Sequence, residues 1–318
     1  MTDSGAPRSF AREDTLRLLQ DRRNWGRWGP DDEYGALNLV TAAKRTQAAA
    51  LVKSGRTVSL SRPFPKDSHV GNPRPALHYM DSEAKEGGGW SNDFVGVAIH
   101  GTCSTHVDAL CHIWDDNGIY NGRRPADVIT YKGATFGDIG KWADGIVTRG
   151  VLIDVPRFRG VDSVSQDAPV HGWELENVCR AQGLEVTPGD ALVVYSGREE
   201  WSRRSGYAWG TVGPPAPTTD EGGPVRPGLH ASCLEFIRDH DAAVLVWDMM
   251  DMLPNQVGLP WSMHGAIFAF GTALVDNALL EPLAIACAEE GRYEFMFVVA
   301  PLRIAGGTGS PANPLAIL

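Results

Sequence analysis

The residues best suited to chemistry lie close together between positions 100 and 112. His100, His106, Asp108 and His112 fall within 13 residues and all occupy even positions. On an extended chain alternate side chains share a face, so His106 and Asp108 would point the same way, about 6.6 Å apart along the strand. Imidazole and carboxylate together suit zinc or manganese better than calcium or magnesium. The segment therefore predicts a site for a divalent metal.

His100 and His112 can join such a site only where the chain bends. A straight strand would put His100 roughly 20 Å from His106, so the chain must turn back at Gly101. If His112 faces the ion without ligating it, it can take a proton from water, because the pKa of histidine suits a general base. A single histidine is usually an ordinary polar residue satisfied by backbone groups. Three histidines and an aspartate in so short a segment favour a functional site.

Two cysteines beside His106 offer a different chemistry, a cysteine–histidine nucleophile pair. Cys103 and Cys111 occupy odd positions, however, and on a strand they would face away from His106. No separate residue that would orient the histidine can be identified. The metal hypothesis accounts for more residues and is favoured.

Other residues could complete the site. Trp114 and Tyr120 follow the bend at His112 and could line a pocket for an aromatic or cyclic substrate, or equally belong to the core. Asp248 and Asp251 follow an apolar run that predicts a buried strand. They are placed to hydrogen-bond a ligating histidine, although solvated turn residues are the more common case.

At these residues the sequence resembles the cyclase family, which includes bacterial kynurenine formamidase and isatin hydrolase. The family signature is His-x-Gly-Thr-His-x-Asp-x-Pro-x-His, and its second half is matched by Thr105-His106-Val107-Asp108-Ala109-Leu110-Cys111-His112. His264, twelve residues before Asp276, resembles the family's distal ligand pair of His and Glu. Similar patches are Gly291-Arg292-Tyr293-Glu294-Phe295 leading into Pro301-Leu302, and Gly309-Ser310-Pro311 with Asn313.

Three positions depart from the family pattern. The family's first histidine lies four residues before the second, where this chain has Thr102. Either a longer turn lets His100 ligate, or the site lacks one ligand. Leu110 replaces the family proline and relaxes the bend there, and Asp276 is one methylene shorter than the family glutamate. Because of these departures and its greater length, the chain resembles the larger bacterial branch of the family.

The resemblance implies a fold, a metal and a reaction. The fold would be α/β, a swivelling β/β/α domain with a mixed sheet and a barrel-like core. The reaction would be arylformamidase-like hydrolysis of an amide, formamide or cyclic imide carbon–nitrogen bond in a small-molecule substrate, by a homodimer or homotetramer. Zinc or manganese would be held by His106, Asp108, His264 and Asp276, with His100 as a further candidate, while His112 moves protons. Two alternatives stay open: a biosynthetic cyclase or dehydratase using the same metal pocket, and a binding protein that lost a ligand at Thr102.

The elements that must position these residues predict a mixed sheet. An arm over residues 1–12 and a helix over 13–22 belong to an N-terminal segment, 1–55, and residues 56–318 would form the hydrolase domain. Short runs rich in Val, Ile or aromatic residues predict strands, and these lie at 57–60, 94–99, 151–155, 191–195, 243–247 and 294–299. Helical patterns cover 173–182 and 231–240, and 203–228 is the largest irregular region. Because regular βαβ alternation is missing, a mixed or partly antiparallel sheet is expected.

Composition excludes several classes of partner. The net charge is −10 and no Lys/Arg cluster is longer than a pair, which argues against nucleic acid or an anionic membrane surface as a partner. The five cysteines are scattered without a CxxC pair, as in a reducing compartment. No signal-peptide core is found, and no stretch approaches the ~20 apolar residues of a membrane span. A cytoplasmic protein is expected.

Overall fold

A computed structural model describes residues 7–318 of the chain, so half of the arm predicted over 1–12 lies outside the described residues. The helix expected over 13–22 is α1 (Arg12–Asp21), which buries Leu18 and Leu19. It is followed by the 3-10 helix η1 (Gly35–Leu39) and by α2 (Ala42–Ala49), which Thr41 caps by accepting a hydrogen bond from the Lys44 amide.

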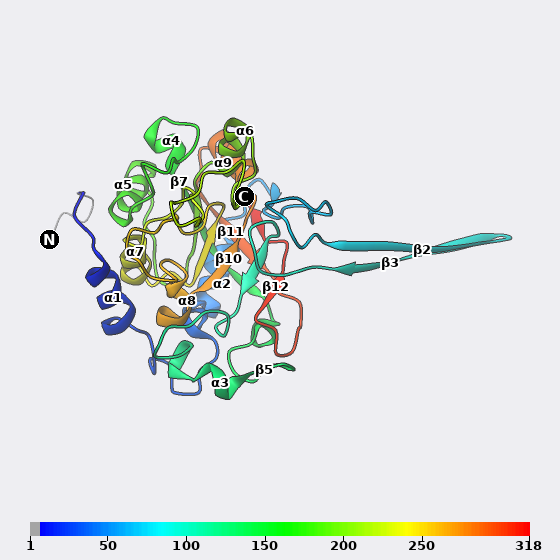
Figure 1. Ribbon diagram of the computed structural model, residues 1–318, viewed down its shortest axis with the longest axis horizontal. Coiled ribbons are helices and arrows are strands. Elements are labelled where there is room, and N and C mark those ends of the chain that lie inside the picture. The colour runs from blue at the N-terminus through cyan, green and yellow to red at the C-terminus, as the bar shows by residue number, and fades with distance from the viewer. Residues whose placement is uncertain (1–6) are drawn as a thin grey trace.

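A nine-stranded mixed sheet forms the centre of the fold and curls into a half-barrel (Figure 1). Its strand order is β1-β13-β11-β7-β8-β9-β10-β4-β12. Four neighbouring strands run parallel: β7 (Ile146–Asp154), β8 (Ala191–Tyr195), β9 (Val244–Trp247) and β10 (Ala273–Asp276). Antiparallel strands flank them, and these are β11 (Glu294–Val299), β13 (Leu315–Ile317) and β1 (Thr57–Ser59) on one side, with β4 (His106–Asp108) and β12 (Gly309–Pro311) on the other.

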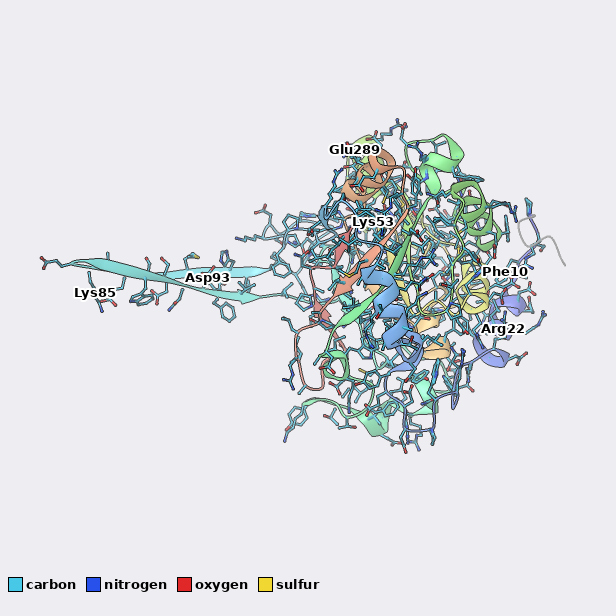
Figure 2. All side chains as sticks on the ribbon, turned by 180° about the vertical axis from the view of Figure 1, so that it is seen from behind. Phe10, Arg22, Lys53, Lys85, Asp93 and Glu289 are labelled. Carbon is cyan, nitrogen blue, oxygen red and sulfur yellow. The ribbon has the colours of Figure 1, made fainter. Side chains whose placement is uncertain are left out.

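The central strands are continuous apolar runs because both faces of the sheet are covered. Every residue of β8, β9 and β10 is buried, as expected of parallel strands with helices on both faces. α5 (Gly172–Gln182) packs against β7 and against α7 (Cys233–Asp239), while α2 packs against β7 and β11. Figure 2, seen from behind, shows the blue α2 in front of the sheet. The α/β class with a mixed sheet is confirmed.

Shorter elements surround this frame. The helices are η2 (Tyr120–Gly122), α3 (Pro125–Val128), η3 (Ile139–Trp142), α4 (Val155–Arg159), α6 (Arg198–Ser205), α8 (Gly265–Phe270) and α9 (Glu281–Glu290), and β5 (Ile129–Thr130) pairs with β6 (Gly133–Ala134). The irregular region predicted over 203–228 begins inside α6 and then continues without a helix or named strand. None of the described helices has the length and apolar character needed to cross a membrane.

Two predicted strands have the wrong bounds. The strand expected over 151–155 is the second half of β7, which already begins at Ile146. The strand expected over 94–99 is β3 (Gly88–Gly96), which pairs with an unexpected strand, β2 (Leu77–Lys85). The two form a hairpin that projects from the body (Figures 1 and 2). Neither strand has one face buried and one exposed, so the burial-driven alternation that marks a strand in a sequence is missing.

Candidate metal centre

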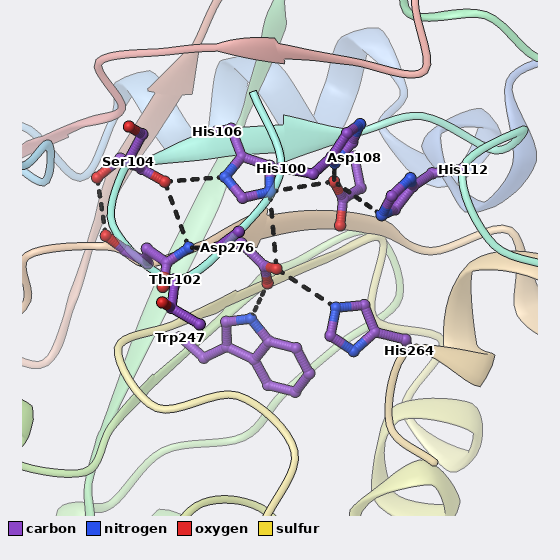
Figure 3. A network of polar contacts seen from close by, with 12 residues as sticks. His100, Thr102, Ser104, His106, Asp108, His112, Trp247, His264 and Asp276 are labelled. Carbon is purple, nitrogen blue, oxygen red and sulfur yellow. Dashed lines mark hydrogen bonds and ion pairs between the residues drawn. The ribbon is translucent and has the colours of Figure 1, made fainter. Parts of the chain in front are cut away.

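β4 presents two of the predicted ligands on one face of the sheet. His106 and Asp108 are alternate residues of this strand, and their atoms Nε2 and Oδ1 lie 3.3 Å apart. β10 runs antiparallel to β4 with Asp276 opposite His106, and opposed residues of such a pair project to the same face. Asp276 Oδ2 consequently lies 3.7 Å from His106 Nε2 (Figure 3).

His264 reaches the same place from the start of α8. It precedes Gly265, the first residue of that helix, and the chain then passes through α8 and back along β10 to Asp276. His264 Nε2 lies 3.3 Å from Asp276 Oδ2. The segments near residues 106 and 264, which are far apart in the sequence, therefore meet at one point.

His100 also reaches the site, from the loop before β4. Gly101 has φ 136°, a conformation that favours glycine, and it lets the chain turn back as predicted. His100 Nδ1 lies 2.9 Å from Asp108 Oδ1, and its Nε2 lies 2.9 Å from the hydroxyl of Thr308. The structure thus brings a histidine to Asp108 although the family position is Thr102.

His112 lies at the open edge of the cluster. Its backbone amide donates to the Ala109 carbonyl, which closes the bend after β4. The imidazole stacks on that of His100, with ring centroids 3.6 Å apart and the planes 4° from parallel, and its Nε2 lies 3.9 Å from Asp108 Oδ1. The His112 side chain is 21% exposed and that of His100 is 26% exposed, whereas Asp108 is fully buried. Access to the site is therefore from the side of these two histidines.

Hydrogen bonds fix the orientation of the two buried imidazoles. Nδ1 of His106 donates to the Ser104 carbonyl at 2.8 Å, and Nδ1 of His264 is bonded to the carboxylate of Asp251. Both rings therefore turn Nε2 toward the carboxylates of Asp108 and Asp276. A bond of this kind on the other ring nitrogen is what orients a metal-ligating histidine in proteins.

The donor set fits a divalent cation. Among residues 7–318, both carboxylate oxygens of Asp108 and the Nδ1 of His100 are buried and make no hydrogen bond of good geometry, although Asp108 Oδ1 and His100 Nδ1 lie only 2.9 Å apart. Two buried carboxylates need compensating positive charge. Potential ligand atoms of two groups lie within 4.8 Å of one another, namely His100, Asp108 and His112, and His106, Asp108 and Asp276. Asp108 belongs to both groups.

The pKa shifts of the site residues also indicate that the buried carboxylates favour positive charge beside them. Burial disfavours the charged form of His106, but the Asp108 carboxylate outweighs burial and raises the pKa of His106 to about 9. For His264 too, Asp251 and Asp276 outweigh burial and raise the pKa well above its usual value. Burial alone would raise the pKa of Asp108, yet His106 and His112 hold it well below its usual range. Burial lowers the pKa of His112 to about 4, so this ring is neutral at pH 7.

Asp251 is a buried support of His264 and not a solvated turn residue, so the more common case expected for it is wrong. Its carboxylate accepts hydrogen bonds from the Ser262 hydroxyl and the Met263 amide, both at 2.6 Å, in addition to its contact with His264. It is 5% exposed. These bonds fix the imidazole against the carboxylate.

The same expectation is wrong for Asp248, which is fully buried. Its carboxylate accepts hydrogen bonds from three successive backbone amides at the start of α6, those of Ser196, Gly197 and Arg198, at 2.9 to 3.0 Å. It therefore anchors α6 and makes no contact with the histidines.

Three supporting residues were not expected from the sequence. The indole Nε1 of Trp247 donates to Asp276 Oδ1. Asn277 donates through Nδ2 to the Gly101 carbonyl at 2.7 Å, and Arg198 donates to Asn277 Oδ1 at 2.7 Å. Trp247 ends a predicted strand and Asn277 follows a predicted ligand, so position alone could have suggested both. Nothing in the sequence around Arg198 indicates its role.

The two aromatic residues proposed to bind substrate lie in different surroundings. Trp114 is 44% exposed and lines a pocket of about 400 Å³ together with Trp261, whose ring centroid is 5.8 Å from that of His264. Tyr120 is instead fully buried in the core and donates through its hydroxyl to Asp32 at 3.1 Å. The structure therefore corrects the expectation for Tyr120, because its ring is closed off by apolar packing.

The cysteines do not form a nucleophile pair with His106. Cys103 donates through Sγ to the Gly71 carbonyl at 2.8 Å. Cys111 is fully buried, and burial raises the pKa of its thiol to about 12. Neither sulfur is bonded to a histidine among the described residues, so the metal hypothesis accounts for the site better.

Comparison with known proteins defines the class to which this fold and site belong. A family model described as "Putative cyclase" matches residues 58–252, more than half of the chain, and the chain belongs to this cyclase family. The resemblance inferred from the sequence is thereby confirmed. A comparison with curated proteins finds no match.

Solved structures agree with this assignment. The crystal structure of a novel cyclase is similar at 28% identity with a TM-score of 0.76, over 93% of this chain and 99% of that one. An isatin hydrolase bound to the product analogue thioisatinate gives 16% identity and a TM-score of 0.56, over 87% and 98% of the two chains. Isatin hydrolase A from Ralstonia solanacearum gives 16% identity and a TM-score of 0.51, over 82% and 91%. At this identity the two isatin hydrolases share the fold.

Proposed function

We propose that the protein is a metal-dependent hydrolase that cleaves the carbon–nitrogen bond of an amide, formamide or cyclic imide. The observation that carries this proposal is the convergence of His106, Asp108, His264 and Asp276 on one buried point. A further histidine, His112, stands at the open edge of the same cluster. Metal-assisted hydrolysis requires buried ligands for the ion and an accessible group that can take a proton, and these residues offer both.

His106, Asp108, His264 and Asp276 would hold the cation, and His100 would be a fifth ligand through Nδ1. The mixture of imidazole and carboxylate donors favours zinc or manganese. When bound, a divalent ion supplies Lewis acidity, which polarises a carbonyl group and makes water a stronger acid. The position of His100 argues against a binding protein that has lost a ligand. Thr102 carries no imidazole, but the imidazole of His100 lies 2.9 Å from Asp108.

His112 is the residue that moves protons in this proposal. It is neutral at pH 7 because burial lowers its pKa, so it can accept a proton from the attacking water. Its stacking on His100 holds the ring at the open edge, next to an incoming substrate. The protonated His112 imidazole can then give this proton to the substrate nitrogen as the carbon–nitrogen bond breaks.

The neighbouring pocket supports an aromatic or cyclic substrate. Its volume of about 400 Å³ suits a small molecule, and the indoles of Trp114 and Trp261 offer flat apolar surfaces. Leu16 and Leu19 of α1 complete the wall, so the N-terminal segment takes part in the pocket. The isatin hydrolases that share this fold are named for a bicyclic aromatic substrate with a cyclic amide.

The proposal is tested by removing and restoring the metal. Purified protein treated with chelator should lose hydrolysis of N-formylkynurenine or isatin, and added Zn²⁺ or Mn²⁺ should restore it. A His106→Ala variant, carried through the same steps, should regain neither metal nor activity. Oxygen from labelled water must appear in the acid product, because a cyclase or dehydratase consumes no water. Activity that persists in metal-free protein would refute the proposal, as would fully loaded protein that hydrolyses no such bond.

A further inference from the structure

A second pocket lies beside the candidate metal centre, on the side of His100. Its volume is about 260 Å³, and His100 forms part of its wall. The rest of the wall comes from residues 70–74, from the turn 98–104 that carries His100, and from the irregular loop after α6, which contributes Arg226. Because His100 Nδ1 lies 2.9 Å from Asp108 Oδ1, a molecule bound in this pocket lies next to the proposed metal ligands.

The charge of this pocket is positive, although the net charge of the chain is −10. Two arginines, Arg74 and Arg226, line the pocket, and none of the described residues of its wall is Asp or Glu. The larger pocket of about 400 Å³ is different, because Asp115 and Asp116 line it against a single arginine, Arg12. A pocket lined by one sign of charge attracts a group of the opposite sign. An anionic group is therefore favoured in the smaller pocket.

Neither guanidinium of the pocket is paired with a carboxylate of the described chain. Among residues 7–318, the only hydrogen bond from the Arg226 side chain runs from Nε to the Asp251 carbonyl, at 3.3 Å. The side chain of Arg74 is exposed and forms no ion pair or hydrogen bond with residues 7–318. The two terminal nitrogens of Arg226 are therefore available as donors. Such a pair of nitrogens forms a fork that matches the two oxygens of a carboxylate.

Packing holds the Arg226 side chain in place. Its guanidinium lies over the indole of the buried Trp209, 4.8 Å from the ring centroid. Its backbone amide donates to the Leu253 carbonyl at 2.9 Å, and its carbonyl accepts from the Leu253 amide at 3.0 Å. Burial lowers the pKa of Arg226 although the carboxylates of Asp251 and Asp276 act in the opposite direction. A further negative charge beside this guanidinium would therefore be stabilising.

We propose that this pocket binds a carboxylate of the substrate through Arg226 and Arg74. The inference rests on the proposed hydrolysis and specifies its substrate, which carries a carboxylate before any bond is cleaved. That carboxylate lies on the side of His100, while the amide, formamide or imide bond lies at the metal centre. Arg226 is then a residue that determines specificity. Arg74, which is exposed, contributes a second, more solvated positive charge.

Binding of small molecules tests the site without turnover. Benzoate and nitrobenzene have the same shape but only benzoate is charged, so calorimetry on the metal-loaded protein should show tighter binding of benzoate. Arg226→Gln should weaken benzoate binding by about 10- to 100-fold with unchanged metal content. Arg74→Gln should weaken it by about two- to fivefold, because that position is exposed. Arg45→Gln, the matched control, removes the same charge from an exposed position of α2 and should leave benzoate binding unchanged.

Three results of these titrations would overturn the proposal. Equal binding of benzoate and nitrobenzene by the natural protein would mean that the pocket does not select an anion. Benzoate affinity that is unchanged in both arginine variants would place the carboxylate on the metal ion. Tighter binding of phenylphosphonate than of benzoate would assign the pocket to a phosphate group. If Arg226→Gln loses metal or fails to fold, Arg74→Gln decides the question, because its exposed side chain supports no other residue.

Two substrates with the same scissile bond connect the pocket with the reaction. 4-Formamidobenzoate and formanilide differ by one carboxylate, and the natural protein should cleave the first with the higher kcat/KM. In Arg226→Gln this ratio should fall by about 10- to 100-fold, mainly through KM, while Arg45→Gln keeps it. An unchanged ratio in Arg226→Gln would contradict the role of Arg226. Protein that binds benzoate as expected but cleaves neither compound, nor isatin, would refute the hydrolysis while supporting the anion site.

Discussion

Replacement of Asp251 by asparagine tests how the orientation of His264, a proposed ligand, affects metal binding while His264 itself stays in place. The Asp251 carboxylate accepts from the Ser262 hydroxyl and the Met263 amide through Oδ1, and bonds His264 Nδ1 through Oδ2. Asparagine has the same shape, and its amide oxygen can still accept from Ser262 and Met263. Its NH₂ group would then face His264 Nδ1, where it can only donate.

That single change should reverse the tautomer of His264. Nδ1 would have to accept from the amide, so the proton would move to Nε2, the atom that lies 3.3 Å from Asp276 Oδ2. A protonated Nε2 cannot ligate a metal. Loss of such a supporting bond typically costs 10- to 100-fold in metal affinity, or about 1.4 to 2.7 kcal/mol. Because the tautomer itself changes here, we expect the upper part of that range.

The measurement is the zinc and manganese affinity of the purified variant, by competition with a chelator of known affinity. Asp239→Asn is the matched control, since it removes one charge from an exposed residue whose partner is Arg22 at 2.6 Å. Asp251→Asn should weaken metal binding while the control leaves it unchanged. Metal affinity in Asp251→Asn equal to that of the natural protein would refute the role assigned to Asp251, provided that both variants melt at similar temperatures.

Three further predictions address the remaining residues. His112→Gln should keep the metal and lose activity by about 10²- to 10⁴-fold, as measured by metal analysis and steady-state kinetics; loss of the ion would make His112 a ligand. His100→Ala should weaken metal binding in a titration, and Thr102→His should then leave affinity in the natural background unchanged, whereas tighter binding would show that a ligand is missing. Burial lowers the pKa of both His171 and His230 to about 4, while an unfolded chain protonates histidine near 6.5. The free energy of unfolding should therefore fall as the pH drops from about 6.5 toward 4, by at most about 1.4 kcal/mol per pH unit for buried His230 and less for solvent-screened His171. Denaturant titrations at several pH values check this, and an unchanged slope in His230→Asn would contradict it.

The sequence was sufficient where local geometry decides the outcome. His106 and Asp108 share a face because alternate residues of any strand do so, and no tertiary information is needed to expect it. The strands of the parallel core could likewise be predicted, because burial on both faces produces uninterrupted apolar runs such as Ala191–Tyr195. The β2–β3 hairpin could not be predicted in this way, because both of its strands are exposed on both faces and carry no burial pattern.

Whether Tyr120 lines a pocket or belongs to the core depends on tertiary packing, which a sequence does not display. An aromatic residue after a bend is compatible with a pocket wall or with a core, and the two differ only in what covers the ring. Here the hydroxyl is bonded to Asp32, a residue 88 positions earlier. Pairing across that distance decides the burial, and no local pattern encodes it.

The position of His100 shows why the missing family histidine could not be resolved from spacing alone. Spacing on a strand puts His100 far from Asp108, and only a reversal of the chain at Gly101 brings Nδ1 to within 2.9 Å. That reversal is held from outside the motif, because Asn277 donates to the carbonyl of Gly101 and is itself held by Arg198. Asp276, the last residue of β10, supplies a carboxylate, and the next residue, Asn277, fixes the loop that supplies the histidine. The two halves of the candidate centre are therefore coupled through this asparagine, which spacing within the motif could not reveal.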